Sequence, residues 1–258
     1  MSLSTDKILI ATKNMVGRLH KNSALEGAAA HLDIGSGHGN LISLLRTEFD
    51  FRSAACDYTD SLMLLKDVKV DVVNLNTEKL PYSDASFDLV TCTEVLEHLE
   101  HYRETLREVL RVLRMNGTLV LTTPNILNLK SRVRFMTFGF YNLFGPLHFR
   151  ESALHTTGGH INPIGLFFLI HSLIDAGFSE IEVTIDKKQG TSRFWLLFLY
   201  LPIQLFSAIT RRKEITKYNT IDSHNEPYVK MINRMDILLG RTIVVGCKKR
   251  SGIVGVQF

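Results

Sequence analysis

The sequence predicts an α/β fold: a doubly wound, mostly parallel seven-stranded sheet with helices on both faces and a helical insertion before the last strand. Three observations lead to this prediction. An apolar strand runs straight into a glycine-rich turn at residues 31–40, strand and helix patterns then alternate, and a long insertion separates the last two strands. Parallel neighbours need helical crossovers, so the alternation favours a parallel sheet.

The composition is that of a folded protein and excludes several classes. The 258 residues are 45% hydrophobic and 22% charged, which is enough to bury the core of one large domain. A net charge of +4 permits nucleic acid as a partner without requiring it. The cysteines Cys56, Cys92 and Cys247 are too few and too scattered for a disulfide framework or a zinc site. Since the first residues lack a secretory signal pattern, we expect a cytoplasmic protein.

The expected elements follow one another along the chain. Strands are expected at residues 31–33, 51–56, 68–75, 87–93, 118–123, 178–185 and 241–247. Helices are expected around 41–45, 62–65, 94–113 and 164–176. The helix over 94–113 has the clearest period and should end at Asn116-Gly117, where glycine supplies the left-handed terminal residue.

Gly35, Gly37 and Gly39 stand where the first strand turns sharply into a helix. Without a Cβ atom at these positions, backbone N–H groups can approach a ligand closely. Asp57 closes the neighbouring strand at the same edge of the sheet, where a carboxylate can accept both hydroxyls of a ribose. The pattern predicts a nucleotide site. Because the glycines follow Gly-x-Gly-x-Gly and not Gly-x-Gly-x-x-Gly, a nicotinamide dehydrogenase is the weaker interpretation.

Four motifs follow in a fixed order: the glycine motif 33–39, the acid Asp57, the Leu-Pro segment 74–81, and Ser86-Phe87-Asp88 with the Glu-His-Leu segment 94–99. Together they resemble the class I S-adenosylmethionine-dependent methyltransferases, most closely the small-molecule and glycolipid branch. The resemblance implies S-adenosylmethionine as cofactor, S-adenosylhomocysteine as product and an activity of class EC 2.1.1.-.

The resemblance also assigns a cofactor site. Amides of the glycine turn would meet the methionyl carboxylate at a helix N-terminus, and Asp33 would orient the ammonium. Asn74 stands where the family more often has an aspartate, so its amide oxygen would have to contact the adenine. The predicted cofactor-binding residues are Asp33, Gly35, Ser36, Gly37, Gly39, Asn40, Asp57, Tyr58, Asn74, Leu75, Asn76, Thr93 and Glu94.

Methyl transfer to a hydroxyl or an amine needs a base, and we predict Glu94, His98 and His160 as catalytic residues. Glu94, Glu97 and His98 are spaced to share one helical face, and His160 follows two glycines in a predicted lid. The competing interpretation is that His98 has only a structural role and is hydrogen-bonded within its own helix. Glutamate and histidine are residue types that can also bind a metal ion. Because the downstream histidines lack the close spacing of a metal-binding pair, we predict no metal.

We divide the chain into four segments. Residues 1–29 form an N-terminal helical cap. Residues 30–186 form a Rossmann-like, S-adenosylmethionine-binding domain that includes the lid at 125–160. Residues 187–240 form an apolar helical insertion, and 241–258 a terminal strand and tail.

Within the insertion, the apolar stretch 194–209 is interrupted by Pro202 and Gln204 and is too short to cross a bilayer, which takes about 20 apolar residues. We favour a buried helix or a dimer interface, since helices that are apolar all round are usually buried. The alternative is peripheral membrane contact through 194–213, with Arg193 and the basic run 211–213 at an anionic lipid surface.

The sequence therefore predicts an enzyme that moves a methyl group from S-adenosylmethionine to a hydroxyl, or an amine, of a small or lipid-linked acceptor. One alternative is an RNA methyltransferase, because Lys130, Arg132 and Arg134 lie among aromatic residues, although nucleic acid is not the expected partner. The other is a protein that binds the cofactor without turnover. We expect the protein in the cytoplasm, at the inner membrane surface if 194–213 meets lipid, and leave a homo-oligomer open.

Overall fold

The computed structural model describes residues 3–20, 29–147 and 159–250. Parts of the predicted cap, lid and tail, at 21–28, 148–158 and 251–258, lie outside the described residues. The strands are β1 (Ala29–Ile34), β2 (Phe51–Asp57), β3 (Val70–Val72), β4 (Phe87–Thr93), β5 (Leu113–Pro124), β6 (Phe178–Ile185) and β7 (Thr242–Lys249).

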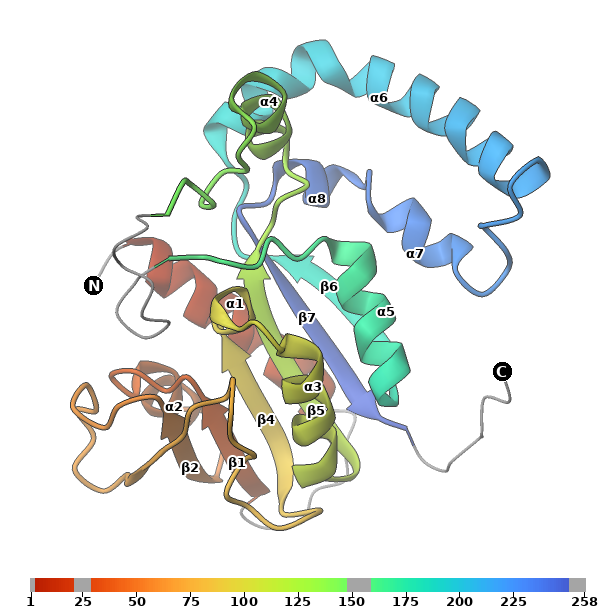
Figure 1. Ribbon diagram of the computed structural model, residues 1–258. Coiled ribbons are helices and arrows are strands. Elements are labelled where there is room, and N and C mark those ends of the chain that lie inside the picture. Colours follow the sequence, from red (N-terminus) through yellow and green to blue (C-terminus); the bar gives the residue numbers. More distant parts are fainter. Residues whose placement is uncertain (1–2, 21–28, 148–158, 251–258) are drawn as a thin grey trace.

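These strands form one sheet in the order β3-β2-β1-β4-β5-β7-β6 (Figure 1). The strands from β3 to β5 pair in parallel, and β7 runs antiparallel to both β5 and β6. The strands β2 and β3 lie on one side of β1, whereas β4 and β5 lie on its other side, so the strand order switches between β1 and β4. Ligands of open α/β sheets bind beyond the carboxyl ends of the strands at such a switch point. The predicted doubly wound, Rossmann-like sheet is confirmed.

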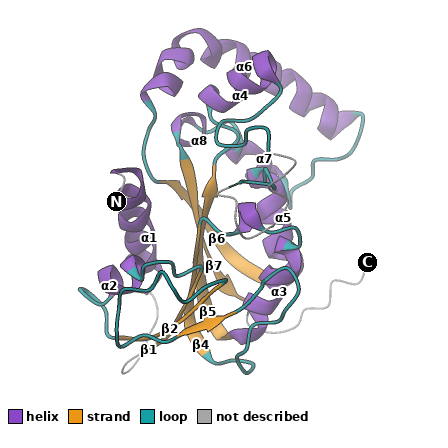
Figure 2. Cartoon of the chain, turned by 60° about the vertical axis from the view of Figure 1, so that its left-hand side comes forward, coloured by secondary structure: helices purple, strands orange, loops and turns teal. Residues whose placement is uncertain are grey.

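Helices cover both faces of the sheet. The helices are α1 (Leu3–His20), α2 (Asn40–Leu45), α3 (Tyr102–Val112), α4 (Leu129–Phe138), α5 (Leu166–Ala176), α6 (Gly190–Thr216), α7 (Glu226–Met231) and α8 (Met235–Leu239), with a 3-10 turn at Leu96–His98. Figure 2 shows α1 and α2 on one side of the sheet and α3 and α5 on the other. Each pair packs on its own cluster of buried side chains, so the sheet is a rigid layer between two cores.

The helix predicted over 94–113 is wrong in its first half. Glu94 has a φ of 54°, which an α-helix does not accept, and a 3-10 turn follows before α3 begins at Tyr102. The apolar period continues across the break because Leu96 and Leu99 enter the same core as α3. The apolar spacing in the sequence therefore suggested one continuous helix where the chain makes a tight turn after β4.

Two smaller predictions are also wrong. The chain around 62–65 makes turns and no helix, because Met63 and Leu65 pack closely over Gly39. The helix α3 ends at Val112, before the predicted Asn116-Gly117, and β5 has already begun when Asn116 takes the left-handed φ of 60°.

Of the two favoured interpretations of residues 194–209, the buried helix is wrong and the dimer interface stays a prediction. The stretch lies inside α6, a 27-residue helix that continues through Pro202 and whose only buried residue is Ser192. The helix is long and apolar enough to cross a membrane by length and composition, so the argument from shortness also fails. One side exposes a row of large apolar side chains, which we call the apolar stripe: Phe194, Leu197, Phe198, Leu201, Leu205, Phe206 and Ile209.

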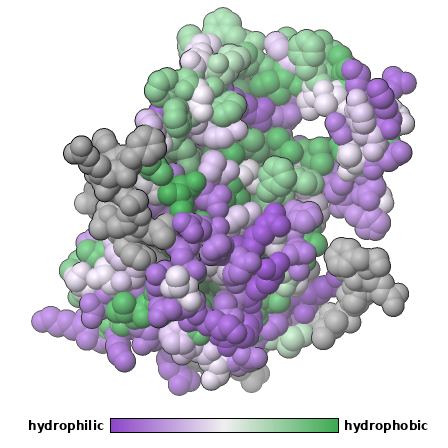
Figure 3. Space-filling view, viewed as in Figure 1, coloured by the Kyte–Doolittle hydropathy of each residue, from purple (hydrophilic) through white to green (hydrophobic). Residues whose placement is uncertain are grey.

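The helices α4, α6 and α8 gather beyond the carboxyl end of β5, on the edge of the sheet that also carries the glycine turn (Figure 1). The helix α6 packs on α4 and α8, and α8 packs on β6. The space-filling view shows hydrophobic surface across this part of the molecule, whereas the surface over the lower half is mainly hydrophilic (Figure 3).

Candidate functional site

The glycine turn connects β1 to α2. Gly35, Gly37 and Gly39 have φ angles of 70°, 47° and 76°, which residues with a Cβ atom rarely adopt. A Cβ atom on Gly35 would lie 2.2 Å from Cγ2 of Val95, so the turn packs directly on the chain after β4. A Cβ atom on Gly37 would meet no atom of the described residues within 4 Å. The turn is therefore held tightly at its start and faces open space at its centre.

Asp57 is the last residue of β2 and is 8% exposed. Its Oδ2 accepts a hydrogen bond from the N–H of Gly37 at 2.8 Å, and its Oδ1 accepts one from the N–H of Tyr58 at 2.7 Å. One carboxylate thus ties the glycine turn to the neighbouring strand. Each oxygen keeps a further lone pair, so the group remains able to accept the two ribose hydroxyls that the sequence assigned to it.

Asp33 lies below the turn in a chain of hydrogen bonds that crosses the sheet. The Thr91 hydroxyl donates to Asp33 Oδ1 at 2.7 Å, and Nε2 of His31 lies 2.8 Å from the same hydroxyl oxygen. Because the hydroxyl has only one proton to donate, Nε2 of His31 is the donor in the second contact. Burial raises the pKa of Asp33 to about 7, so a cationic group placed beside it would favour its ionised form.

The remaining cofactor-site predictions around the turn fall on the same edge of the sheet. The hydroxyl of Ser36 is buried and has no hydrogen-bond partner among the described residues. Asn40 begins α2, Tyr58 follows β2 with its ring exposed, and Thr93 ends β4. A buried hydroxyl without a partner is costly, so Ser36 favours a polar ligand at this place.

Asn74, Leu75 and Asn76 follow β3 at the same edge. Oδ1 of Asn74 accepts the N–H of Asn76 at 3.1 Å, and Oδ1 of Asn76 accepts the N–H of Glu100 at 2.9 Å. Leu75 packs half-buried against the main core. Both amide oxygens therefore already organise the loop, and an adenine contact by Asn74 would use the second lone pair of its oxygen.

Glu94 adopts its left-handed conformation directly after β4. Its N–H donates to the Thr122 carbonyl oxygen at 3.1 Å, and its carboxylate accepts the Thr122 hydroxyl at 3.2 Å. Burial raises the pKa of this carboxyl to about 7. A residue that combines a strained backbone conformation with a shifted side-chain pKa, at the carboxyl end of a strand, is typical of a functional site.

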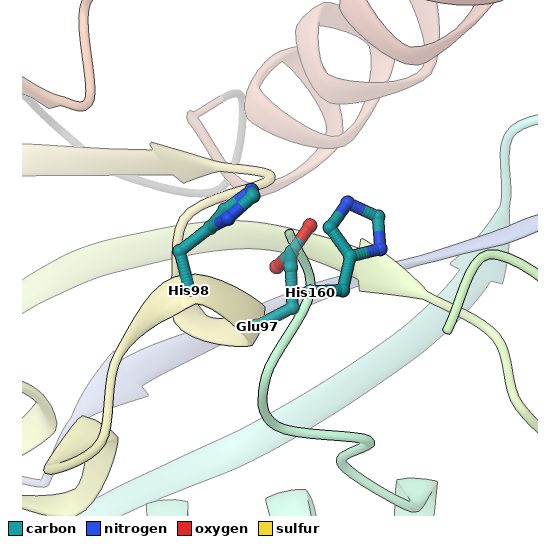
Figure 4. Close-up of side chains that lie close together, drawn as sticks. All are labelled: Glu97, His98 and His160. Atoms are coloured by element: carbon teal, nitrogen blue, oxygen red, sulfur yellow. The ribbon is translucent and has the colours of Figure 1, made fainter. Parts of the chain in front are cut away.

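The two predicted catalytic histidines lie side by side, although they are far apart in the sequence (Figure 4). Their ring centroids are 4.9 Å apart, and Nδ1 of His98 donates to the carbonyl oxygen of Gly159 at 3.0 Å. Burial lowers the pKa of His98, and burial followed by the neighbouring His98 lowers the pKa of His160 to about 4. Both rings are therefore neutral at pH 7, which leaves nitrogen lone pairs available.

Glu97 was grouped with Glu94 and His98 by its spacing in the sequence but was not among the predicted catalytic residues, and its carboxylate lies between the two rings (Figure 4). It is fully buried, one oxygen accepts the Thr123 hydroxyl at 3.1 Å, and Oε1 has no partner among the described residues. Its carbonyl oxygen accepts the N–H groups of Ile161 and Asn162, which brings His160 to the turn. The signal in the sequence was the Glu-His pair at 97–98, a few residues after β4, but the helix wrongly predicted over 94–113 concealed the turn that it occupies.

The residues at this edge fit S-adenosylmethionine. The open space over Gly37 and the unpartnered hydroxyl of Ser36 suit the amino-acid end, Asp33 suits an ammonium, and Asp57 suits a ribose. The turn between β4 and α3 lies at the same edge of the sheet and carries Glu94 and His98.

We expect Gly37→Ala to weaken S-adenosylmethionine binding at least about tenfold, which is about 1.4 kcal/mol, because the new methyl group enters the open space over the turn. Gly139→Ala is the matched control, since Gly139 also has a positive φ and no atom within 4 Å of its Cβ position. Each change should cost about 1–2 kcal/mol of stability. Calorimetric titration that gives equal affinity in both variants would contradict the placement of the cofactor.

We expect Asp57→Ala to weaken S-adenosylmethionine binding at least about tenfold, because both the ribose contact and the anchor of the Gly37 N–H are lost. Asp60→Ala, at an exposed position three residues later, should bind normally. Titration calorimetry gives the affinities, and circular dichroism checks that both variants are folded. Unchanged affinity in Asp57→Ala would show that the ribose contact is misassigned.

Comparison with known proteins agrees with this site. Residues 32–121 match the family model described as "Methyltransferase domain". A probable S-adenosylmethionine-dependent methyltransferase of Mycobacterium tuberculosis is 36% identical over 115 residues, which cover 45% of this chain and 35% of that protein. The ubiquinone/menaquinone biosynthesis C-methyltransferase of Pseudomonas fluorescens is 33% identical over 120 residues, which cover 43% of this chain and 46% of that protein. The chain thus spans less than half the length of these two relatives.

The similarity in structure extends further than the similarity in sequence. A solved S-adenosylmethionine-dependent methyltransferase from Archaeoglobus fulgidus superposes with a TM-score of 0.53 over 93% of this chain and 94% of that one, at 18% identity. Such a likeness shows the fold, and the family match covers the glycine turn, Asp57 and the turn after β4. Residues 32–121 of this chain therefore match a methyltransferase domain, the chain has the fold of a solved S-adenosylmethionine-dependent methyltransferase, and S-adenosylmethionine is the cofactor that the site fits.

Proposed function

We propose that the protein transfers the methyl group of S-adenosylmethionine to a hydroxyl, or an amine, of a small or lipid-linked acceptor, and that it meets this acceptor at a membrane surface. The observation that carries the proposal is one of position. The helix α6, which carries the apolar stripe, lies beyond the carboxyl end of β5 (Figure 1), and β1 and β4, which run parallel to β5, lead at the same edge into the glycine turn and the turn with His98.

The chemistry asks little of the protein beyond alignment and proton removal. The cofactor supplies an activated methyl group on a sulfonium, so the chain must hold the acceptor in line with it and exclude water. A hydroxyl or ammonium acceptor also has to lose a proton. His98 and His160 are neutral at pH 7, and Nε2 of His98 keeps its lone pair because Nδ1 donates to Gly159.

The inner side of α6 is tied to the protein, which supports contact with a membrane surface over a transmembrane orientation. Gln204 donates to the carbonyl oxygen of Asn233, and the amide of Asn233 donates to the hydroxyl of Ser207. The hydroxyl of Ser192 accepts the N–H of Lys130 in α4. These contacts turn the apolar stripe outward, which is the arrangement of a helix that lies in the interface of a bilayer.

Two further features support an anionic lipid surface. Exposed Phe135, Met136 and Phe138 of α4 add apolar area beside α6. Arg193 precedes the apolar stripe and the basic residues 211–213 follow it, where each cation near an anionic bilayer contributes about 1 kcal/mol. We place the protein in the cytoplasm at the inner membrane surface, consistent with three buried, free cysteines.

The acceptor class follows from this placement. A site that opens beside lipid suits an acceptor with an apolar tail, such as a lipid-linked sugar or a quinone-like intermediate. The similarity to a relative named for ubiquinone and menaquinone biosynthesis supports a lipid-soluble acceptor.

The RNA alternative loses its main support. The guanidinium of Arg132 donates to the carbonyl oxygens of Leu127 and Ile232, and that of Arg134 donates to the carbonyl oxygen of Tyr141. Two of the three cations that suggested RNA therefore stabilise the fold around α4. RNA binding would require a steep dependence on salt, which a filter-binding titration measures directly.

We expect His98→Ala and His160→Ala to lower the methyl-transfer rate by about 10²-fold or more while S-adenosylmethionine affinity changes little, because both rings lie on the acceptor side of the site. The assay follows S-adenosylhomocysteine formation with membrane-lipid extract as acceptor. A wild-type rate in both variants would exclude histidine from the proton transfer. Cofactor binding without any product formation would favour the alternative of a binding protein.

We expect the protein to float with vesicles of phosphatidylglycerol and phosphatidylcholine, and Leu197→Glu to weaken this binding about tenfold by placing a charge in the apolar stripe at a position that is 81% exposed. Met115→Glu is the matched control, since Met115 is also exposed but lies at the amino end of β5. Equal flotation of both variants would exclude lipid contact through α6. Loss of dimers in sedimentation, without any flotation, would show that a second copy covers the apolar stripe.

A further inference from the structure

We propose that Glu97, His98 and His160 bind one divalent first-row transition-metal ion, and that this ion holds the oxygen of the methyl acceptor. The role in acceptor binding rests on the proposed function, whereas the metal site itself does not. The sequence predicted no metal here, so this proposal reverses that expectation.

The three side chains converge in the way that a metal centre requires. One oxygen of Glu97 and one nitrogen from each histidine lie within 4.8 Å of one another. Atoms that share an ion at bond lengths of about 2.1 Å are themselves roughly 3–4 Å apart, so small rotations of the side chains bring them into position. Two imidazoles and one carboxylate suit divalent zinc, manganese, iron or cobalt. Three protein ligands leave coordination positions open for a substrate.

The strongest support is an unsatisfied carboxylate. Glu97 is fully buried, one of its oxygens accepts the Thr123 hydroxyl, and Oε1 has no hydrogen-bond partner among the described residues. Glu94 is a second carboxylate beside it, which makes an unpaired charge still more costly. A bound cation satisfies the free oxygen and offsets the negative charge, and no described cationic side chain forms an ion pair with Glu97.

The histidines are also arranged as ligands. The carbonyl oxygen of Gly159 accepts Nδ1–H of His98, which fixes the ring and leaves the lone pair on Nε2. Nδ1 of His160 is buried without a hydrogen-bond partner among the described residues. Figure 4 shows the two rings on either side of the Glu97 carboxylate. A backbone carbonyl that orients a ligating histidine is the usual outer partner of a metal centre.

In the transfer itself, the acceptor hydroxyl would bind at the open position and lose its proton to solvent. Its oxygen then forms the new C–O bond while the C–S bond of the cofactor breaks, and the sulfur keeps that electron pair. The products are the methylated acceptor, S-adenosylhomocysteine and one proton. In this arrangement His98 and His160 bind the ion and do not act as bases.

The test is a titration of the full chain, freed of metal with a chelator, with Co²⁺ as a visible-absorbance probe and Zn²⁺ as competitor. We expect one Co²⁺ per chain, displaced by Zn²⁺. Since removing even an outer partner costs 10–100-fold in affinity, Glu97→Gln and His160→Gln should each weaken binding by more than about tenfold. Glu100→Gln and His101→Gln are matched controls, because both side chains are exposed in the next turn.

Each outcome decides one part of the proposal. Absence of a Co²⁺ signal, or equal Co²⁺ affinity in the site and control variants, overturns the metal site. Thermal unfolding checks that each variant is folded. If Glu97→Gln unfolds because the residue lies in the core, His160→Gln, whose residue lies on a loop, provides the test. Stoichiometric Co²⁺ binding without methyl transfer supports the site and counts against the proposed function. Full methyl transfer in excess chelator supports the proposed function and overturns the role of the ion in it.

Discussion

The carboxylate of Asp57 is the contact on which the cofactor site depends. It accepts one N–H from the glycine turn and one from its own loop, so two neighbouring parallel strands end in a single hydrogen-bonded unit. The turn needs this anchor because its three glycines with positive φ have the most backbone freedom to lose when the turn is ordered. Because the turn is fixed, its backbone amides and the Asp57 carboxylate are already in position before a ligand binds. This preorganisation reduces the conformational entropy that is lost on binding.

A second buried carboxylate, that of Glu97, organises the turn after β4. Glu97 uses its backbone carbonyl to hold the chain at Ile161 and Asn162, and this contact brings His160 against His98. The side chain of the same residue stays in the core, and one of its oxygens has no partner within the described part of the chain. A single residue thus assembles the cluster and leaves it in need of a cation or a proton, which is an arrangement that proteins retain at functional sites and rarely elsewhere.

The helix α6 links the site to its surroundings. Its inner face is held by hydrogen bonds to Asn233 and by packing on α4, while its outer face carries large apolar side chains into solvent. An exposed apolar surface of this extent is unusual for a soluble monomer and marks an interaction site, which the proposed function assigns to a membrane surface.

The sequence alone determined the sheet, the glycine turn and the acid at the end of β2, because these depend on local patterns: apolar strands, glycines at a strand-to-helix turn and spacing between neighbouring strands. It misjudged the turn after β4 and the burial of α6, because periodicity reports which side chains are apolar and not what they pack against. Only the tertiary structure brought His160 to His98 and Glu97, since contacts between distant segments follow from how loops close over the sheet and leave no periodic trace in the sequence.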